Sequence, residues 1–257
     1  FGIERKTQII SEDEVEYVEE EEMVEDYPIR LFRTEHGYIK KISLVSLRSS
    51  GEQKLKDDDT LIQEIETSNR AEVLLFADSG DVYKIKASEI PDCKASQLGE
   101  YIPNLLSMQA GEKVIGMIAA TDFEGFVLFC FENGKIAKIS LKSYETKLNR
   151  KKLTNAYSTA SPLIKMLFMR EETELAAISS IGKALVFDSA NIAVKTTKSS
   201  QGVNVLTSKR GSKMVDVLLA SETAFSDTSY YKTKNIPAVG CFIRDEDKGL
   251  EQMSLDV

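Results

Sequence analysis

Lysine and arginine are the side chains whose types and spacing suggest chemistry in this sequence, because they gather at similar places along the chain. Seven bases and two acids lie from Arg30 to Lys56, five bases and one acid from Lys142 to Lys152, and five bases with no acid from Lys195 to Lys213. A weaker cluster from Lys84 to Lys94 is offset by neighbouring acids. Contacts from these side chains to phosphate do not depend on base sequence, so such clusters are typical of proteins that bind a polyanion.

We predict that these clusters bind a polyanion such as nucleic acid. The predicted contact residues are Lys40, Lys41, Arg48, Lys54, Lys56, Lys84, Lys86, Lys94, Lys142, Lys147, Arg150, Lys151, Lys152, Lys195, Lys198, Lys209, Arg210 and Lys213. The alternative is that they are ordinary solubilising side chains. Clustering that recurs in a chain with a net charge of −8 favours the first interpretation.

Other kinds of site are poorly represented. The single histidine, His36, stands in an expected turn, and Gly182-Lys183 lacks the spaced glycines and the Ser or Thr of a phosphate-binding loop. Cys93, Cys130 and Cys241 are far apart and have no C-x-x-C spacing, which argues against a disulfide framework or a zinc site. We expect no catalytic residue, no metal and no cofactor in this chain.

The elements that must position the bases are strand pairs joined by a turn with glycine. The apolar run Phe126–Phe131 is followed by a turn at Asn133-Gly134 and a second run at Ile136–Ile139. An Asn-Gly pair between two apolar runs predicts a β-hairpin, because both turn residues must tolerate positive φ. The pattern recurs at Ile29–Phe32 and Tyr38–Ile42 around Gly37, at Val73–Ala77 and Val82–Ile85 around Gly80, and at Leu175–Ile178 and Ala184–Phe187 around Gly182.

A second half of each repeat follows the hairpin. A further apolar run comes at Leu61–Ile65, Val114–Ala119, Leu163–Leu167 and Val215–Leu219. It is preceded by a candidate strand or bend that is clearest at Ile102–Met108 and Val203–Thr207. The turn glycines are 43, 54 and 48 residues apart, a period typical of a propeller or a related array. We predict an all-β fold of four four-stranded blades packed around an axis. Bases at one repeated position then form a curved stripe, which suits a polyanion that must bend.

The two ends of the chain differ from the repeats. Tyr230–Ile243 offers one or two strands, interrupted by Pro237, and predicts a partial fifth blade that an N-terminal strand would complete. The predicted organisation is a linker and acidic segment at 1–28, the repeat domain at 29–243 and an acidic tail at 244–257. Nothing near Phe1 resembles a signal peptide and no run is long enough to span a membrane, so we expect a piece of a longer cytoplasmic protein.

Charge is distributed unevenly between these parts. Residues 1–29 carry a net −9, which leaves +1 for the remainder of the chain. The acids of residues 11–26 either contribute solubility or compete with nucleic acid for the basic loops. They also leave open a second function, a propeller that serves as a protein interaction scaffold without binding DNA.

Several segments together resemble a known family. They are HGYIKKISLVSL, LLFADSGDVYKIKASEIPD, LGEYIPNLL, FENGKIAKISLKSYETK and KTTKSSQGVNVL, with ERKTQI near the start and TKNIPAVGCF near the end. In combination, over nearly the whole chain, they resemble the C-terminal repeat domain of the A subunit of bacterial type IIA topoisomerases, the family of DNA gyrase and topoisomerase IV.

The resemblance implies a β-pinwheel, in which neighbouring blades exchange strands and a basic rim bends or wraps duplex DNA for strand passage. It also implies a non-catalytic part of an A2B2 holoenzyme associated with the nucleoid. The tyrosine that attacks DNA belongs to another part of the same polypeptide, and the ATPase, which needs ATP and Mg, belongs to the B subunit.

One segment departs from the family pattern. The gyrase A subunit carries the box Gln-Arg-Arg-Gly-Gly-Lys-Gly in its first blade, and that box is associated with chiral wrapping. The corresponding residues here, Arg48 to Lys56, have one glycine and contain Glu52. The resemblance therefore favours a protein like topoisomerase IV, with a gyrase that has a degenerate box as the other interpretation.

Overall fold

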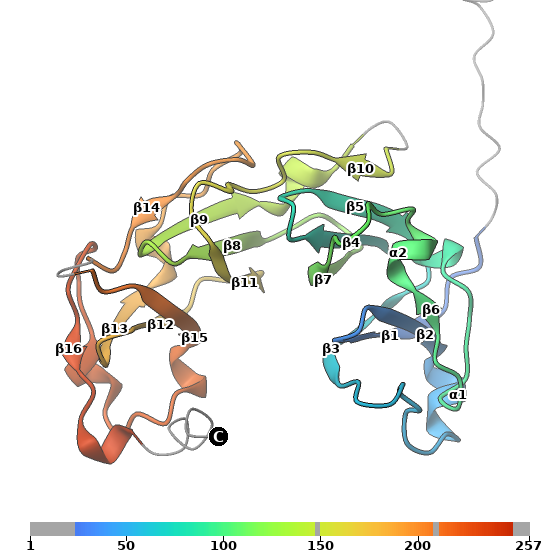
Figure 1. Cartoon of the computed structure of the whole chain (residues 1–257), viewed down its shortest axis with the longest axis horizontal. Coiled ribbons are helices and arrows are strands. Elements are labelled where there is room, and N and C mark those ends of the chain that lie inside the picture. The colour runs from blue at the N-terminus through green and yellow to red at the C-terminus, as the bar shows by residue number, and fades with distance from the viewer. Residues whose placement is uncertain (1–23, 147–149, 208–210, 249–257) are drawn as a thin grey trace, which may run out of the picture.

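The fold is an open arc of four antiparallel sheets with four strands each (Figure 1). The computed structural model describes residues 24–146, 150–207 and 211–248. Within these residues no helix is long and apolar enough to cross a membrane. We number the sheets as blades 1 to 4 along the chain. The all-β architecture and the four four-stranded blades predicted from the sequence are confirmed.

Each blade has the same strand order, from the hollow of the arc to its outer side. Blade 1 has the order β3-β1-β2-β6, blade 2 β10-β5-β4-β7 read from the outside, blade 3 β11-β8-β9-β14 and blade 4 β15-β12-β13-β16. In Figure 1, β3, β7, β11 and β15 face the hollow, whereas β10, β14 and β16 lie on the convex side.

The strand bounds show how the repeats map onto these blades. The central hairpins are β1 (Pro28–Thr34) with β2 (Tyr38–Ser43), β4 (Glu72–Ala77) with β5 (Val82–Lys86), β8 (Phe126–Phe131) with β9 (Lys135–Ser140), and β12 (Glu174–Ser179) with β13 (Lys183–Asp188). The inner strands are β3 (Leu61–Ser68), β7 (Val114–Ala120), β11 (Leu163–Met169) and β15 (Met214–Leu219). The short outer strands are β6 (Glu100–Tyr101), β10 (Lys152–Leu153), β14 (Val203–Asn204) and β16 (Cys241–Phe242).

The hairpins form where the turn glycines predict them. Gly37, Gly80, Gly134 and Gly182 have φ of 85°, 89°, 84° and 69°, a region that side chains rarely adopt. The apolar runs on both sides of each turn pair in antiparallel register, as in Phe126↔Ser140 through Cys130↔Ile136. All four predicted hairpins and the four predicted inner strands are confirmed.

The outer strand of blades 1, 2 and 3 comes from the next repeat along the chain. β6 follows the hairpin of blade 2 but pairs with β2, while β10 pairs with β5 and β14 with β9 in the same way. This strand exchange between neighbours is the β-pinwheel arrangement that the resemblance implied. None of the first three repeats supplies its own outer strand, and the candidate strand or bend at Ile102–Met108 is not a strand. That segment begins with the short helix α2 (Ile102–Leu105), which has Pro103 in its first turn, a position that tolerates proline.

Three hydrophobic clusters fill the spaces between successive blades. One joins Ile29 and Leu31 of blade 1 to blade 2, the next joins Phe76 of blade 2 to Phe129 of blade 3, and the third joins blades 3 and 4. The middle strands are buried on both faces, which is why β8 is buried from Phe126 to Phe131. Apolar burial between neighbours therefore holds the arc together.

Both ends of the arc are covered by the chain itself. On blade 1, Phe32 and Ile42 pack against Leu47 of α1 (Leu44–Arg48) and against Cys93 and Ala95. On blade 4, residues 220–247 form a cap in which Tyr231 is 1% exposed and its hydroxyl donates to Asp247 at 2.5 Å. Because β16 pairs with β13, Tyr230–Ile243 completes blade 4, so the expected partial fifth blade was wrong for this segment. The N-terminal strand expected to help close the ring, at Thr7–Ile10, lies outside the described residues.

Domain boundaries at 28, 243 and 257 remain predictions. Residues 24–27 contact blade 1, where the Tyr27 hydroxyl donates to Asp92 at 2.9 Å. Asp247, just past the second predicted boundary, accepts the N–H of Ser226 at 2.7 Å. The described residues next to both boundaries therefore contact the repeat domain.

The exchanged strands depend on glycines at positions where a residue with a side chain would clash. A Cβ on Gly202, ahead of β14, would lie 2.2 Å from the Ile136 carbonyl oxygen, whereas one on Gly111 would meet nothing within 4 Å. Both glycines have positive φ, 76° and 89°. We expect Gly111→Ala to lower the free energy of unfolding by about 1 kcal/mol and Gly202→Ala by about 3 kcal/mol or more. Urea unfolding measures both, and equal losses would contradict a role for the close approach.

Candidate nucleic-acid interface

The outer side of the arc is built by four crossover segments, each of which runs back along the second hairpin strand of a blade. We define them as residues 90–99 on blade 1, the described residues 145–146 and 150–151 on blade 2, 193–201 on blade 3 and 232–240 on blade 4. Each is hydrogen-bonded to the backbone of the fourth residue after the turn glycine. The segment donates in three blades, from Cys93 N–H to Lys41 O at 2.9 Å, Lys195 N–H to Lys138 O at 2.8 Å and Thr233 N–H to Val186 O at 2.8 Å, and it accepts in blade 2, where Lys84 N–H donates to Lys151 O at 2.9 Å. The four segments therefore occupy one repeated position on the convex side.

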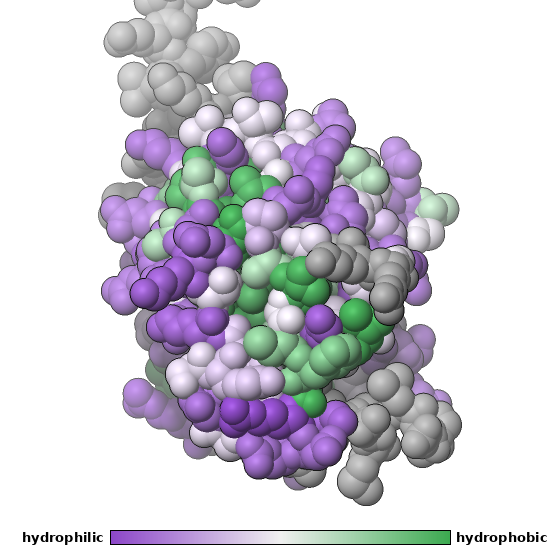
Figure 2. All heavy atoms as spheres, turned by 90° about the vertical axis from the view of Figure 1, so that its left-hand side faces the viewer, coloured by the Kyte–Doolittle hydropathy of each residue, from purple (hydrophilic) through white to green (hydrophobic). Residues whose placement is uncertain are grey.

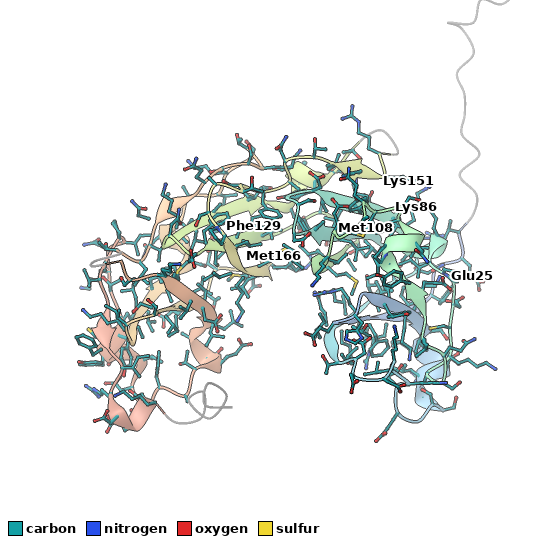
Figure 3. All side chains as sticks on the ribbon, viewed as in Figure 1. Glu25, Lys86, Met108, Phe129, Lys151 and Met166 are labelled. Atoms are coloured by element: carbon teal, nitrogen blue, oxygen red, sulfur yellow. The ribbon has the colours of Figure 1, made fainter. Side chains whose placement is uncertain are left out.

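Most of the described bases on these segments are exposed. Arg150, Lys151 and Lys195 are exposed and have no ion-pair partner within residues 24–146, 150–207 and 211–248. Lys198 is half-buried and donates to the Ser143 carbonyl at 3.3 Å. Figure 3 shows Lys151 on the outer side of the arc, away from Phe129 and Met166, which lie among the sheets. Exposed, unpaired cations on a convex surface are suited to contact phosphates.

Other predicted bases lie elsewhere on the surface. Arg48, Lys54, Lys56, Lys86 and Lys142 are exposed outside the crossover segments, and Lys94 is exposed on the segment of blade 1. Lys213 lies beside the turn of blade 3 and pairs with Glu132 at 2.9 Å. The predictions for Lys147, Lys209 and Arg210 lie outside the described residues.

Three predicted DNA contacts are buried, and for these the prediction must be corrected. Lys40 has no exposed surface, and its Nζ donates to the carbonyls of Lys54 and Ala95 at 3.2 and 2.9 Å. Lys41 and Lys84 are 3% and 4% exposed. Their ammonium groups cannot reach a phosphate in this structure.

Lys41 and Lys84 belong to a repeated structural position, four residues after the turn glycine. Their partners are Asp92 at 3.3 Å and Glu72 at 2.8 Å. Lys138 occupies this position in blade 3, where it is 1% exposed and paired with Glu172. A buried ammonium needs such a partner, because desolvation disfavours its charged form.

Lys152 is held in a local network and is only partly available to a ligand. Its side chain is 28% exposed and pairs with Asp81 at 2.9 Å and Glu112 at 3.6 Å. The hydroxyl of Tyr83 accepts from Lys152 and donates to Glu112. The hydrogen bonds that Lys152 donates to Tyr83 and Asp81 raise the pKa of Lys152. Burial would raise the pKa of Glu112, but hydrogen bonds from Tyr83 and the Gln109 N–H, among others, lower it to about 2.

Sequence reasoning missed Lys232 and Lys234. Both are exposed and lie on the crossover segment of blade 4, where Lys232 pairs with Glu174. The signal was present, because Lys232-Thr-Lys234 precedes Gly240 much as Lys195-Thr-Thr-Lys198 precedes Gly202. It was overlooked because Tyr230–Ile243 was assigned to a fifth blade.

The strand-exchanged blades define the class of this protein, the β-pinwheel. In sequence, the chain is 26% identical over 197 residues to the A subunit of DNA topoisomerase 4 from Staphylococcus aureus. This match covers 75% of the chain, and the chain spans about a quarter of that relative. No family model matches the sequence.

Solved structures agree with this class. The C-terminal domain of DNA topoisomerase IV is 27% identical, with a TM-score of 0.67 over 79% of this chain and 64% of that one. The gyrase A C-terminal domain (20% identical, TM-score 0.54, 83% and 76% covered) and the E. coli ParC C-terminal domain (14% identical, TM-score 0.60, 75% and 79% covered) share the fold. The relatives and neighbours of this chain are thus the A subunits of topoisomerase IV and gyrase and their C-terminal domains, as the resemblance indicated.

Buried and exposed lysines are expected to respond differently to substitution. Lys84→Met removes the partner of Glu72, whose side chain is 31% exposed and can be partly rehydrated, so we expect a loss of about 1–3 kcal/mol in unfolding free energy. Its affinity for duplex DNA should stay within about twofold, because the side chain does not reach the surface. Lys151→Met should weaken DNA binding and leave the unfolding free energy nearly unchanged. Urea unfolding and a DNA gel shift measure the two quantities for both variants. A large loss of DNA affinity in folded Lys84→Met would contradict the correction made above.

Stability should depend on pH through Glu112. Its folded pKa of about 2 lies below the usual 4.5, so its contribution is present above pH 4.5 and is lost as the pH falls towards 2. We expect Glu112→Gln to cost about 2 kcal/mol at pH 7 and to flatten the fall in stability between pH 5 and pH 2. Urea midpoints across this range measure it, and a parallel pH profile for both proteins would contradict the assignment.

Proposed function

We propose that this chain is a non-catalytic domain that binds duplex DNA and bends it around the convex side of the arc. The observation that carries the proposal is the set of exposed cations on crossover segments at one repeated position. Three of these segments, on blades 2, 3 and 4, carry two or more described bases. Phosphates spaced along a curved duplex match cations spaced along an arc.

Binding of this kind should have little sequence preference. The proposed contacts are lysine and arginine side chains on an outer surface, which position DNA through its phosphates. A convex surface reaches the backbone of a bent duplex more readily than the base edges within a groove. We therefore propose bending energy and charge, rather than base readout, as the basis of affinity.

The larger assembly is also a proposal, since the chain spans about a quarter of its topoisomerase relatives. We propose that it belongs to the A subunit of a type IIA topoisomerase with A2B2 composition, and that it presents DNA to the cleavage core in the cytoplasm. The nucleophilic tyrosine and the ATPase of the B subunit, with its ATP and Mg, would then lie outside this domain.

Among type IIA enzymes, we propose an activity like that of topoisomerase IV. The support is the segment from Arg48 to Lys56, which lacks the gyrase box, together with 27% identity to a topoisomerase IV domain and 20% to a gyrase domain. Relaxation of circular DNA with the domain bound distinguishes the two interpretations. An unchanged linking number is expected for simple bending, and a shift would indicate chiral wrapping.

Affinity for duplex DNA should fall steeply with salt. With roughly five to eight phosphates neutralised, the logarithm of the affinity should fall with the logarithm of salt concentration with a slope of about −5 to −7. Gel shifts with duplexes of unrelated sequence, each about 40 base pairs long so that the duplex can bend along the arc, should give the same slope. Absence of binding at low salt would refute the proposed function.

A protein interaction scaffold is the second candidate, and a specific observation favours it. Ile181, Val194 and Phe242, on or beside elements of blades 3 and 4, are 44%, 48% and 63% exposed. Figure 2 faces this side and shows hydrophobic surface between hydrophilic margins. Exposed apolar patches mark interaction sites. Capture of a protein partner by a chain that fails to bind DNA would support the scaffold instead.

A further inference from the structure

The convex side of the arc does not have the same charge on every blade. The crossover segment of blade 3 carries Lys195 and Lys198 and no acid, and that of blade 4 carries Lys232 and Lys234 and no acid. Blade 2 has Arg150 and Lys151 in its segment, with Glu145 as the acid. These three margins each have more bases than acids among the described residues.

Blade 1 has no such excess of bases. Its crossover segment has a single base, Lys94, while Asp92 lies on the same segment and Glu89 and Glu100 flank it, all three exposed. Asp92 is partly neutralised by the buried Lys41 at 3.3 Å. Glu89 and Glu100 have no ion-pair partner among the described residues. Lys54, whose N–H donates to the Ala95 carbonyl at 2.8 Å, adds a second exposed base here, so bases and acids are about balanced and this margin attracts a duplex less than the other three.

The margins of blades 3 and 4 are also joined physically. The N–H of Thr207 donates to the Ala238 carbonyl at 2.8 Å, and the N–H of Ala238 donates to the Val205 carbonyl at 3.0 Å. These bonds connect the chain that leaves β14 to the crossover segment of blade 4. The lysines of the two blades are therefore carried by a hydrogen-bonded, continuous outer surface.

The bases on blade 4 are available to a phosphate. Lys234 is exposed and has no ion-pair partner within the described part of the chain. Lys232 pairs with Glu174, but both side chains are substantially exposed at 48% and 38%. Exposed ion pairs contribute little stability, so a phosphate can take the place of Glu174. Beyond these residues, the exposed acids Asp245 and Glu246 pair with Lys248 at 2.5 Å and Arg244 at 3.5 Å, so the bases no longer outnumber the acids there.

We infer that bound duplex DNA follows a track over blades 2, 3 and 4 and does not run over the margin of blade 1. The track is formed by Arg150, Lys151, Lys195, Lys198, Lys232 and Lys234. Its two ends are set by the acids of blade 1 and by those of the cap. This inference rests on the proposed function and adds to it the path of the DNA and the contact residues on blade 4.

Paired charge reversals test the path. In the 257-residue chain, Lys232→Glu with Lys234→Glu should weaken binding to a duplex about tenfold or more near 0.1 M salt and reduce the magnitude of the salt slope by about 2. The matched control reverses Lys54 and Lys94, two exposed bases at the margin of blade 1, and should change affinity less than about threefold. Circular dichroism and urea unfolding confirm that both variants are folded.

A gain of affinity provides a test that does not depend on weakening the protein. Glu89→Gln with Glu100→Gln removes the acids that flank the blade 1 segment, so DNA can extend onto it. We expect tighter binding, about threefold or more, and a steeper salt slope. An unchanged affinity would contradict the role of these acids in ending the track.

The outcomes separate this inference from the proposed function. If the unmodified chain does not bind DNA, the proposed function is wrong and the track with it. If it binds, two results would overturn only the track. One is an equal loss of DNA affinity for the Lys54 and Lys94 reversal and the Lys232 and Lys234 reversal, and the other is no loss for the Lys232 and Lys234 reversal. A larger loss on blade 4 together with a gain on blade 1 supports the path.

Discussion

The structure depends on one repeated hydrogen bond, between the carbonyl of each turn glycine and the chain that leaves an outer strand. The donors are the N–H groups of Ile102, Ala156, Val205 and Ile243, and the acceptors are Gly37, Gly80, Gly134 and Gly182, at 2.9, 2.7, 2.9 and 2.9 Å. In the first three cases the donor belongs to the segment that returns from the next blade. This bond fixes where the returning chain lies and therefore where its lysines point outward.

The hairpins were predictable because they are local. The glycine turn and the apolar runs around it stand within about twenty residues, so period and turn chemistry are enough to find them. The outer strands are only two residues long, and those of blades 1 to 3 pair with a different repeat. Such short strands leave no periodic signal, and their partners are distant in sequence. The strand exchange was therefore predicted from the family resemblance, and the sequence pattern alone could not have predicted it.

The candidate site was predictable in its general position but not residue by residue. In strands buried on both faces, alternation does not separate inward from outward side chains, so Lys40, Lys41 and Lys84 looked like surface bases. Their burial depends on oxygen partners elsewhere in the fold, such as Glu72 and Asp92. Clustering correctly indicated the exposed bases around Lys151 and Lys195. Whether they bind DNA stays a prediction.

The cap on blade 4 explains how the described array ends at its last sheet. Earlier blades receive their outer strand from the following repeat, but β16 comes from the segment that directly follows blade 4, and Tyr231 with Asp247 holds this segment against the sheet. The segment after blade 4 thus caps the last described sheet, as the end repeats of stacked arrays generally must.

Strand exchange also sets an order of events during synthesis on the ribosome. Blade 1 stays one strand short until residues 100–101 have left the exit tunnel, blade 2 until residues 152–153 and blade 3 until residues 203–204. The outer edge of each of these blades therefore stays unpaired until the hairpin of the next blade and the outer strand that follows it have emerged. Translation that pauses inside a hairpin would leave the preceding blade open to pairing with a neighbouring nascent chain.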